Sequence, residues 1–116
     1  MTKIYHLSTC STCQRILTET GAIAKGCLLQ DIKTEKITPA QLDELREKAG
    51  SYEALFSRRA MKFKEWGLKD KELTETDYRD LILREYTFLK RPVAISDDRI
   101  FVGSDKKTVE QLKASI

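Results

Sequence analysis

The sequence predicts an α/β protein with a four-stranded mixed sheet and a helical insertion between the two halves of that sheet. Three observations support this fold class: a strand–helix–strand pattern at the start, a strand–strand–helix pattern at the end, and only helical patterns between them. At 116 residues, the chain is expected to form one domain over residues 1–116. The insertion is expected at about 38–89.

The first half of the sheet is predicted to begin with a strand over residues 3–7. A helix should start near Cys10, with Ser8 or Thr9 as its cap. A short apolar run over residues 27–32 predicts the next strand. The apolar face of the helix is expected to carry Cys13, Ile16 and Leu17.

The insertion carries two helix-start signals. Thr38 precedes a proline and lies three residues before Gln41, which predicts a capping box, and Gly50 predicts the end of that helix. Thr74 and Asp77 have the same spacing at the start of a later helix. Helical spacing predicts buried side chains at Leu42, Leu45, Tyr78, Leu81, Ile82 and Tyr86.

The second half of the sheet is predicted to be a hairpin followed by a helix. Residues 91–95 form a strand pattern entered through Pro92, and residues 99–102 form another. Asp97-Asp98 between them predicts the turn. Residues 107–114 have the spacing of a final helix.

The charge and hydropathy of the chain argue against nucleic acid and membranes as binding partners. The chain has 21 basic and 18 acidic residues, a net charge of +3, which does not favour direct binding to nucleic acid. The basic and aromatic segment 62–66 is better explained as a helical turn that buries Phe63 and Trp66. No apolar run has the length of a membrane helix or a signal peptide, so we expect no membrane association and a cytoplasmic location.

Cys10 and Cys13 form a C-x-x-C pair between the first strand and its helix. Unpaired N–H groups at a helix start favour a thiolate, so Cys10 is the candidate nucleophile and Cys13 the candidate resolving thiol of a redox disulfide. The alternatives are a buried structural thiol at Cys10 and an apolar packing residue at Cys13. Cys27 is expected in the core. Beyond the Cys10–Cys13 pair, the chain offers only Cys27 and His6 as metal ligands, so a zinc site is not expected.

Several segments together resemble the arsenate reductase (ArsC) family, which has a thioredoxin-like fold and includes the Spx transcriptional regulators. The C-x-x-C pair lies near residue 10, an Arg-Pro pair opens the third strand, and helices lie between them. The matching segments are His6–Leu17, Ser57-Arg58, Gly67-Leu68, Leu89–Val93 and Arg99–Gly103.

The resemblance implies roles for individual residues. It makes Cys10 the nucleophile, places Arg91 and Arg58 on a bound oxyanion, and gives a cis peptide bond before Pro92, which faces the cysteine. Paired N–H donors suit arginine to a tetrahedral oxyanion, although solvated surface charge is the ordinary role of such a residue. His6 would support the thiolate or contact the anion; the alternative is a histidine satisfied by a neighbour.

Four positions depart from the glutaredoxin-dependent arsenate reductases and resemble the Spx branch. Leu7-Ser8 replaces an Asn-Pro pair, Cys13 replaces a serine, and Val102 stands where a third oxyanion arginine is expected. Ser57 takes the place of the first arginine, and Arg58 follows it.

The resemblance implies one of two functions. The first is a thiol-dependent oxidoreductase that acts on a small oxyanion or a disulfide, has no bound cofactor, and is recycled by thioredoxin or by glutathione and glutaredoxin. The alternative is an Spx-like redox-sensing regulator that binds RNA polymerase and changes state when Cys10 and Cys13 form a disulfide.

Overall fold

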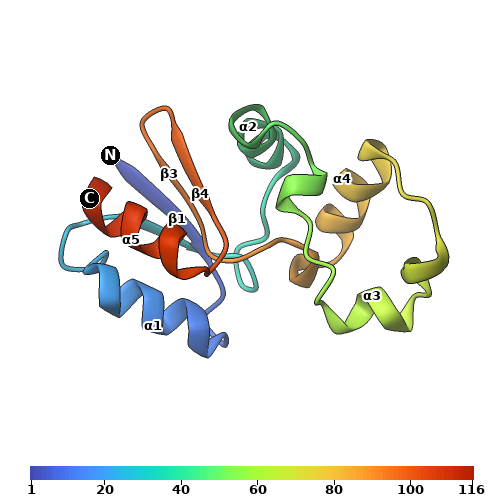
Figure 1. The fold of residues 1–116 in the computed structure, drawn as a ribbon, viewed down its shortest axis with the longest axis horizontal. Coiled ribbons are helices and arrows are strands. Elements are labelled where there is room, and N and C mark those ends of the chain that lie inside the picture. Colours follow the sequence, from blue (N-terminus) through green and yellow to red (C-terminus); the bar gives the residue numbers. More distant parts are fainter. The chain divides into compact units, whose positions relative to one another are not determined.

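The computed structural model describes all residues, Met1–Ile116, as two compact units. The first unit contains Met1–Lys36 and Arg91–Ile116, and the second contains Ile37–Lys90. Figure 1 labels their main elements. No helix is long and apolar enough to cross a membrane.

The first unit is built on a four-stranded sheet of order β2-β1-β3-β4. β1 and β2 are parallel, whereas the β1–β3 and β3–β4 pairs are antiparallel. A parallel pair needs a crossover connection, and α1 supplies it. The predicted α/β class and mixed four-stranded sheet are therefore confirmed. The elements are β1 (Thr2–His6), α1 (Ser11–Thr20), β2 (Leu28–Asp31), β3 (Val93–Ser96), β4 (Arg99–Val102) and α5 (Lys106–Ser115).

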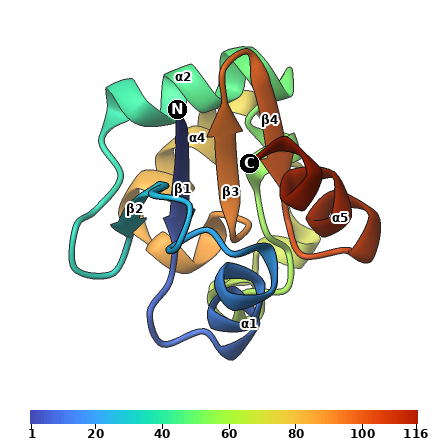
Figure 2. The ribbon, with the colours of Figure 1, turned by 90° about the vertical axis from the view of Figure 1, so that its left-hand side faces the viewer.

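One face of this sheet is covered by α1 and α5 (Figure 2). Ile4, Ala94 and Phe101 are neighbours across β1, β3 and β4, so their side chains share a face. They form one buried cluster with Leu17 of α1 and Leu112 of α5. As predicted, α1 buries Cys13, Ile16 and Leu17. Cys27, predicted to be a core residue of the second strand, lies just before β2, is half-buried and packs against this cluster.

The second unit consists of helices: α2 (Pro39–Ala49), α3 (Met61–Glu65), α4 (Glu75–Arg84) and the short 3-10 helices η1 (Glu53–Leu55), η2 (Leu68–Asp70) and η3 (Tyr86–Phe88). Both predicted capping boxes are present, at Thr38 and at Thr74. Tyr86 lies in η3 beyond the end of α4 and is half-buried, so its predicted place on that helix was wrong. Phe63 and Trp66 are also only half-buried.

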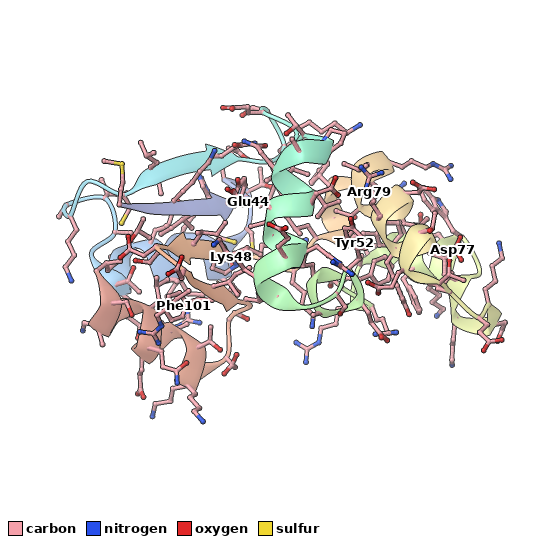
Figure 3. All side chains as sticks on the ribbon, turned by 90° about the horizontal axis from the view of Figure 1, so that it is seen from above. Glu44, Lys48, Tyr52, Asp77, Arg79 and Phe101 are labelled. Carbon is pink, nitrogen blue, oxygen red and sulfur yellow. The ribbon has the colours of Figure 1, made fainter.

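A polar junction ties α2 to α4 within this unit. The Tyr52 hydroxyl donates to Asp43 Oδ1 at 2.7 Å. Arg79 donates from Nε and a terminal nitrogen to the two Asp43 oxygens, at 2.9 and 3.2 Å. Figure 3, which labels Tyr52 and Arg79, shows both side chains beside α2. Such a two-point contact fixes the orientation of the pair better than a single ion pair does.

Candidate active site at Cys10

Cys10 lies where the loop after β1 turns into α1. It occupies the cap position of α1 with extended backbone (φ −93°, ψ 113°), so the prediction that Ser8 or Thr9 caps the helix was wrong. The reason is a turn: the Cys10 N–H donates to the Leu7 carbonyl at 3.0 Å, which places Ser8 and Thr9 in the middle of the turn. The Cys10 carbonyl then accepts the first helical hydrogen bond, from Gln14 N–H at 3.1 Å.

The pKa of the Cys10 thiol is lowered from its ordinary value. Partial burial alone would raise this pKa. Hydrogen bonds from the N–H and the side chain of Cys13 lower the pKa most. The charge of Arg91 and the N–H of Thr12 lower it by smaller amounts. Although the thiol makes no hydrogen bond of cap geometry, the N–H groups of the first helical turn favour its thiolate. Cys10 therefore has the electrostatic character of a nucleophile.

Cys13 has the opposite character. Its side chain has no exposed surface, and burial, the largest influence, raises its pKa to about 11 despite a backbone hydrogen bond from Leu7 that favours the thiolate. The charge of the neighbouring Cys10 raises it further. No disulfide joins the two cysteines in the structure. A half-exposed, acidic thiol thus lies beside a buried, protonated one, which is the arrangement expected of an attacking and a resolving thiol.

Arg91 and Pro92 lie in the segment that enters β3, and the charge of Arg91 acts on Cys10. The peptide bond between them is cis, as the resemblance implied. The Pro92 carbonyl accepts the Gly103 N–H at 2.9 Å, which ties this segment to the residue after β4. Arg91 is half-buried. Its positive charge lowers the pKa of both thiols, although burial and hydrogen bonds have larger effects on these pKa values. The structure therefore brings Arg91 to Cys10.

His6 is buried, with 8% of its surface exposed, and its Nδ1 makes no hydrogen bond. It is the last residue of β1 and pairs in register with Asp31, the last residue of β2. The pKa of Asp31 is lowered mainly by a hydrogen bond from the Ser8 side chain, against the effect of burial. The N–H groups of Lys33 and Ser8 lower it further, and the charge of His6 makes the smallest contribution. His6 thus lies at the carboxyl edge of the parallel strands, where the Cys10 loop begins.

Arg58 belongs to the second unit. Its guanidinium donates to Glu53 Oε2 at 2.8 Å and to the Tyr78 hydroxyl at 2.7 Å, and it lies 5.5 Å from the centre of the Tyr78 ring. Both hydrogen bonds use one terminal nitrogen of the guanidinium, and both partners belong to the same unit as Arg58. A place for Arg58 on a bound oxyanion stays a prediction.

Two supporting residues were missed in the sequence. Asp31 Oδ1 accepts the Ser8 N–H at 3.3 Å, and Gln14 Nε2 donates to the Leu7 carbonyl at 3.4 Å. Asp31 could have been found as the polar end of the strand parallel to β1, because carboxyl ends of parallel strands meet at one edge. No three His, Cys, Asp or Glu side chains gather in a way that could hold a metal ion.

Replacing Arg91 tests its effect on Cys10. Arg91→Leu should move the pH profile of Cys10 alkylation to higher pH and slow alkylation near neutral pH by about threefold to tenfold, since a nearby positive charge is lost. Arg91→Lys keeps a charge and should retain most of the rate. The measurement is iodoacetamide labelling followed by mass spectrometry, with Arg99→Leu as the matched control on β4. An unchanged Arg91→Leu profile would refute the assignment.

A mixed sheet of this order, with a cysteine of lowered pKa at the start of its first helix, is a thioredoxin-like arrangement. A model of the ArsC family matches residues 5–112, so the chain belongs to the ArsC family. No curated protein matches the sequence.

Solved structures with arsenate reductase titles share the fold. The arsenate reductase from Vibrio cholerae has a TM-score of 0.79 at 16% identity, over 99% of this chain and 97% of that one. A possible arsenate reductase from Streptococcus mutans gives 0.76 at 24% identity, over 97% of both chains. An arsenate reductase related protein from Brucella melitensis gives 0.71 at 23%, over 95% of this chain and 92% of that one. At these identities, the likeness shows the fold.

Proposed function

We propose that the chain is a thiol-dependent reductase of arsenate with Cys10 as its nucleophile. The observation that carries the proposal is the lowered pKa of Cys10 at the start of α1, with the charge of Arg91 beside it. A tetrahedral oxyanion at this place would meet N–H groups of the helix start and one guanidinium. Arg58 is the proposed second guanidinium, and Cys10 is also suited to attack a disulfide.

The proposed reaction transfers two electrons from thiols to arsenic. The Cys10 thiolate forms a bond to As(V), and an arsenate oxygen takes up protons and leaves as water. A second thiol then attacks the Cys10 sulfur; the S–As bond breaks, and its electron pair stays on arsenic as arsenite. The second thiol is Cys13 or glutathione, and the product is a disulfide.

The donor that reduces this disulfide decides how the enzyme is recycled. Thioredoxin would clear a Cys10–Cys13 disulfide, whereas glutathione with glutaredoxin would clear a mixed disulfide on Cys10. Either route uses soluble thiols and no bound cofactor, and we place it in the reducing cytoplasm.

NADPH consumption tests the proposal. Purified protein is supplied with arsenate and with either the thioredoxin or the glutaredoxin recycling components, and we expect arsenate-dependent oxidation of NADPH with at least one of them. Phosphate, a tetrahedral anion that thiols do not reduce, is the matched control and should give none. Failure of both donor systems above the rate without the protein would overturn the arsenate proposal.

The C-x-x-C pair also favours the second candidate, a redox-sensing regulator that binds RNA polymerase. Oxidation of Cys10 and Cys13 would alter the start of α1. The resemblance to Spx proteins also aligns Gly50, which ends α2 with φ 96°, with a glycine of their polymerase contact, although glycine is an ordinary residue at a helix end. Binding to the C-terminal domain of the RNA polymerase α subunit, measured with reduced and oxidised protein, tests this alternative. No binding in either state would exclude it.

A further inference from the structure

Asp31 joins the end of β2 to the loop that carries Cys10. β1 and β2 run parallel and end together at His6 and Asp31, and the Ile32 N–H donates to the His6 carbonyl at 2.9 Å. The loop between β1 and α1 begins at the next residue, Leu7. The carboxylate of Asp31 therefore lies at the edge of the sheet from which the loop departs.

The Asp31 carboxylate binds backbone on both sides of this edge. Its Oδ1 accepts the Ser8 N–H at 3.3 Å and the Lys33 N–H at 3.1 Å. The Asp31 carbonyl accepts the Glu35 N–H at 2.8 Å and the Thr34 hydroxyl at 3.4 Å, which holds the turn after β2. The carboxylate that accepts the Ser8 N–H thus belongs to a residue whose own backbone is fixed by hydrogen bonds in the turn after β2.

The contact at Ser8 acts directly on the turn that ends at Cys10. Leu7 and Cys10 close this turn through the Cys10 N–H, and Gln14 Nε2 also donates to the Leu7 carbonyl. Asp31 binds the turn at its second residue, so the loop is held both from α1 and from β2. We propose that Asp31 is a positioning residue for Cys10: by accepting the Ser8 N–H, it holds the Leu7–Cys10 turn in the form that places the thiol at the start of α1.

The role follows from the position of an acceptor and not from charge. The Ser8 side chain lowers the pKa of Asp31 more than any other group does. The N–H groups of Lys33 and Ser8 and the charge of His6 lower this pKa further. The carboxylate is therefore ionised at neutral pH. A negative charge acting on Cys10 through space would disfavour its thiolate. A charge effect and a positioning effect therefore predict opposite changes when Asp31 is replaced.

Three variants separate the two effects. Asp31→Asn keeps an oxygen acceptor without the charge, Asp31→Glu keeps the charge but moves the acceptor by one methylene, and Asp31→Ala removes both. The matched control is Asp80→Ala, which removes an exposed carboxylate from α4. The measurement is the rate of Cys10 alkylation by iodoacetamide in the reduced full-length chain, by mass spectrometry, between about pH 5 and pH 10.

Asp31→Ala and Asp31→Glu should shift the midpoint of this profile to higher pH and slow alkylation near pH 7 by about threefold to tenfold, the effect of losing about one hydrogen bond. Asp31→Asn and Asp80→Ala should match the wild type. If Asp31→Ala fails to fold, the alkylation profiles of Asp31→Glu and Asp31→Asn are compared instead, and the proposal requires that only Asp31→Glu shifts to higher pH. Unchanged profiles in Ala and Glu, or a shift to lower pH shared by Ala and Asn, would overturn the proposal.

The inference rests on Cys10 being the reactive thiol, as in the proposed function, but its test uses no arsenate. A wild-type protein with a low alkylation midpoint and no arsenate turnover would refute the substrate and leave the role of Asp31 to be judged by the variants. Normal turnover in Asp31→Ala together with an unshifted profile would refute the positioning role alone.

Discussion

Cys10→Ser is expected to abolish arsenate-dependent turnover, with a loss of about a thousandfold or more. A serine hydroxyl does not ionise near neutral pH, so the N–H groups and the charge of Arg91 that favour a thiolate have no anion to stabilise. The same variant should lose the rapid iodoacetamide labelling of the wild type. NADPH consumption and mass spectrometry of the labelled protein measure the two effects.

The fold should survive this substitution. Serine is close to cysteine in shape and is a favoured residue at the helix cap, which is where the structure places Cys10. The thermal midpoint should therefore stay the same or rise, which separates a chemical loss from unfolding.

Cys27→Ser is the matched control, because it removes a half-buried thiol that packs against the core and not at the helix start. It should keep the wild-type turnover. Turnover by Cys10→Ser close to that of the wild type would show that the reactive sulfur is not Cys10.

The elements of the first unit could be predicted because their signals are local. Alternating or apolar runs mark β1, β2 and the β3–β4 hairpin, and each is present within a few residues of its expected bounds. The approach of Arg91 to Cys10 depends on pairing between β1 and β3, which are far apart in sequence. No local pattern encodes that pairing, so the resemblance to the ArsC family supplied it.

The errors at the site also have physical causes. Serine and threonine are better intrinsic caps than cysteine, but the hydrogen bond from Cys10 N–H to the Leu7 carbonyl places Ser8 and Thr9 in a turn. Asp31 was missed because its contact with Ser8 joins the end of β2 to the loop after β1, two segments that the α1 crossover separates in sequence. In both cases, contacts made by the backbone decided which side chain serves the site.

Phe56→Ala is expected to destabilise the second unit by about 3–5 kcal/mol. The Phe56 side chain is 1% exposed, and its ring lies 4.9 Å from Tyr78, 5.0 Å from Phe88 and 6.0 Å from Phe63, centre to centre. Removing the ring leaves a cavity among aromatic side chains that can close only in part.

The backbone at Phe56 adds to this expectation. Phe56 forms an isolated antiparallel bridge with Leu89. On either side of it, the Ser57 N–H donates to the Phe88 carbonyl at 2.7 Å and the Lys90 N–H donates to the Leu55 carbonyl at 2.8 Å. The ring thus lies where the middle of this helical unit is hydrogen-bonded to its carboxyl-terminal end, so its loss should weaken more than one helix.

Urea unfolding combined with native-state hydrogen exchange measures the effect, with exchange in α2 and α4 expected to accelerate most. Phe63→Ala is the matched control: it deletes the same group from a half-buried position in α3 and should cost much less. Equal costs would contradict the central place of Phe56. Because the Phe56 ring packs on Tyr78, whose hydroxyl binds Arg58, the same variant should loosen the residue proposed as the second oxyanion ligand.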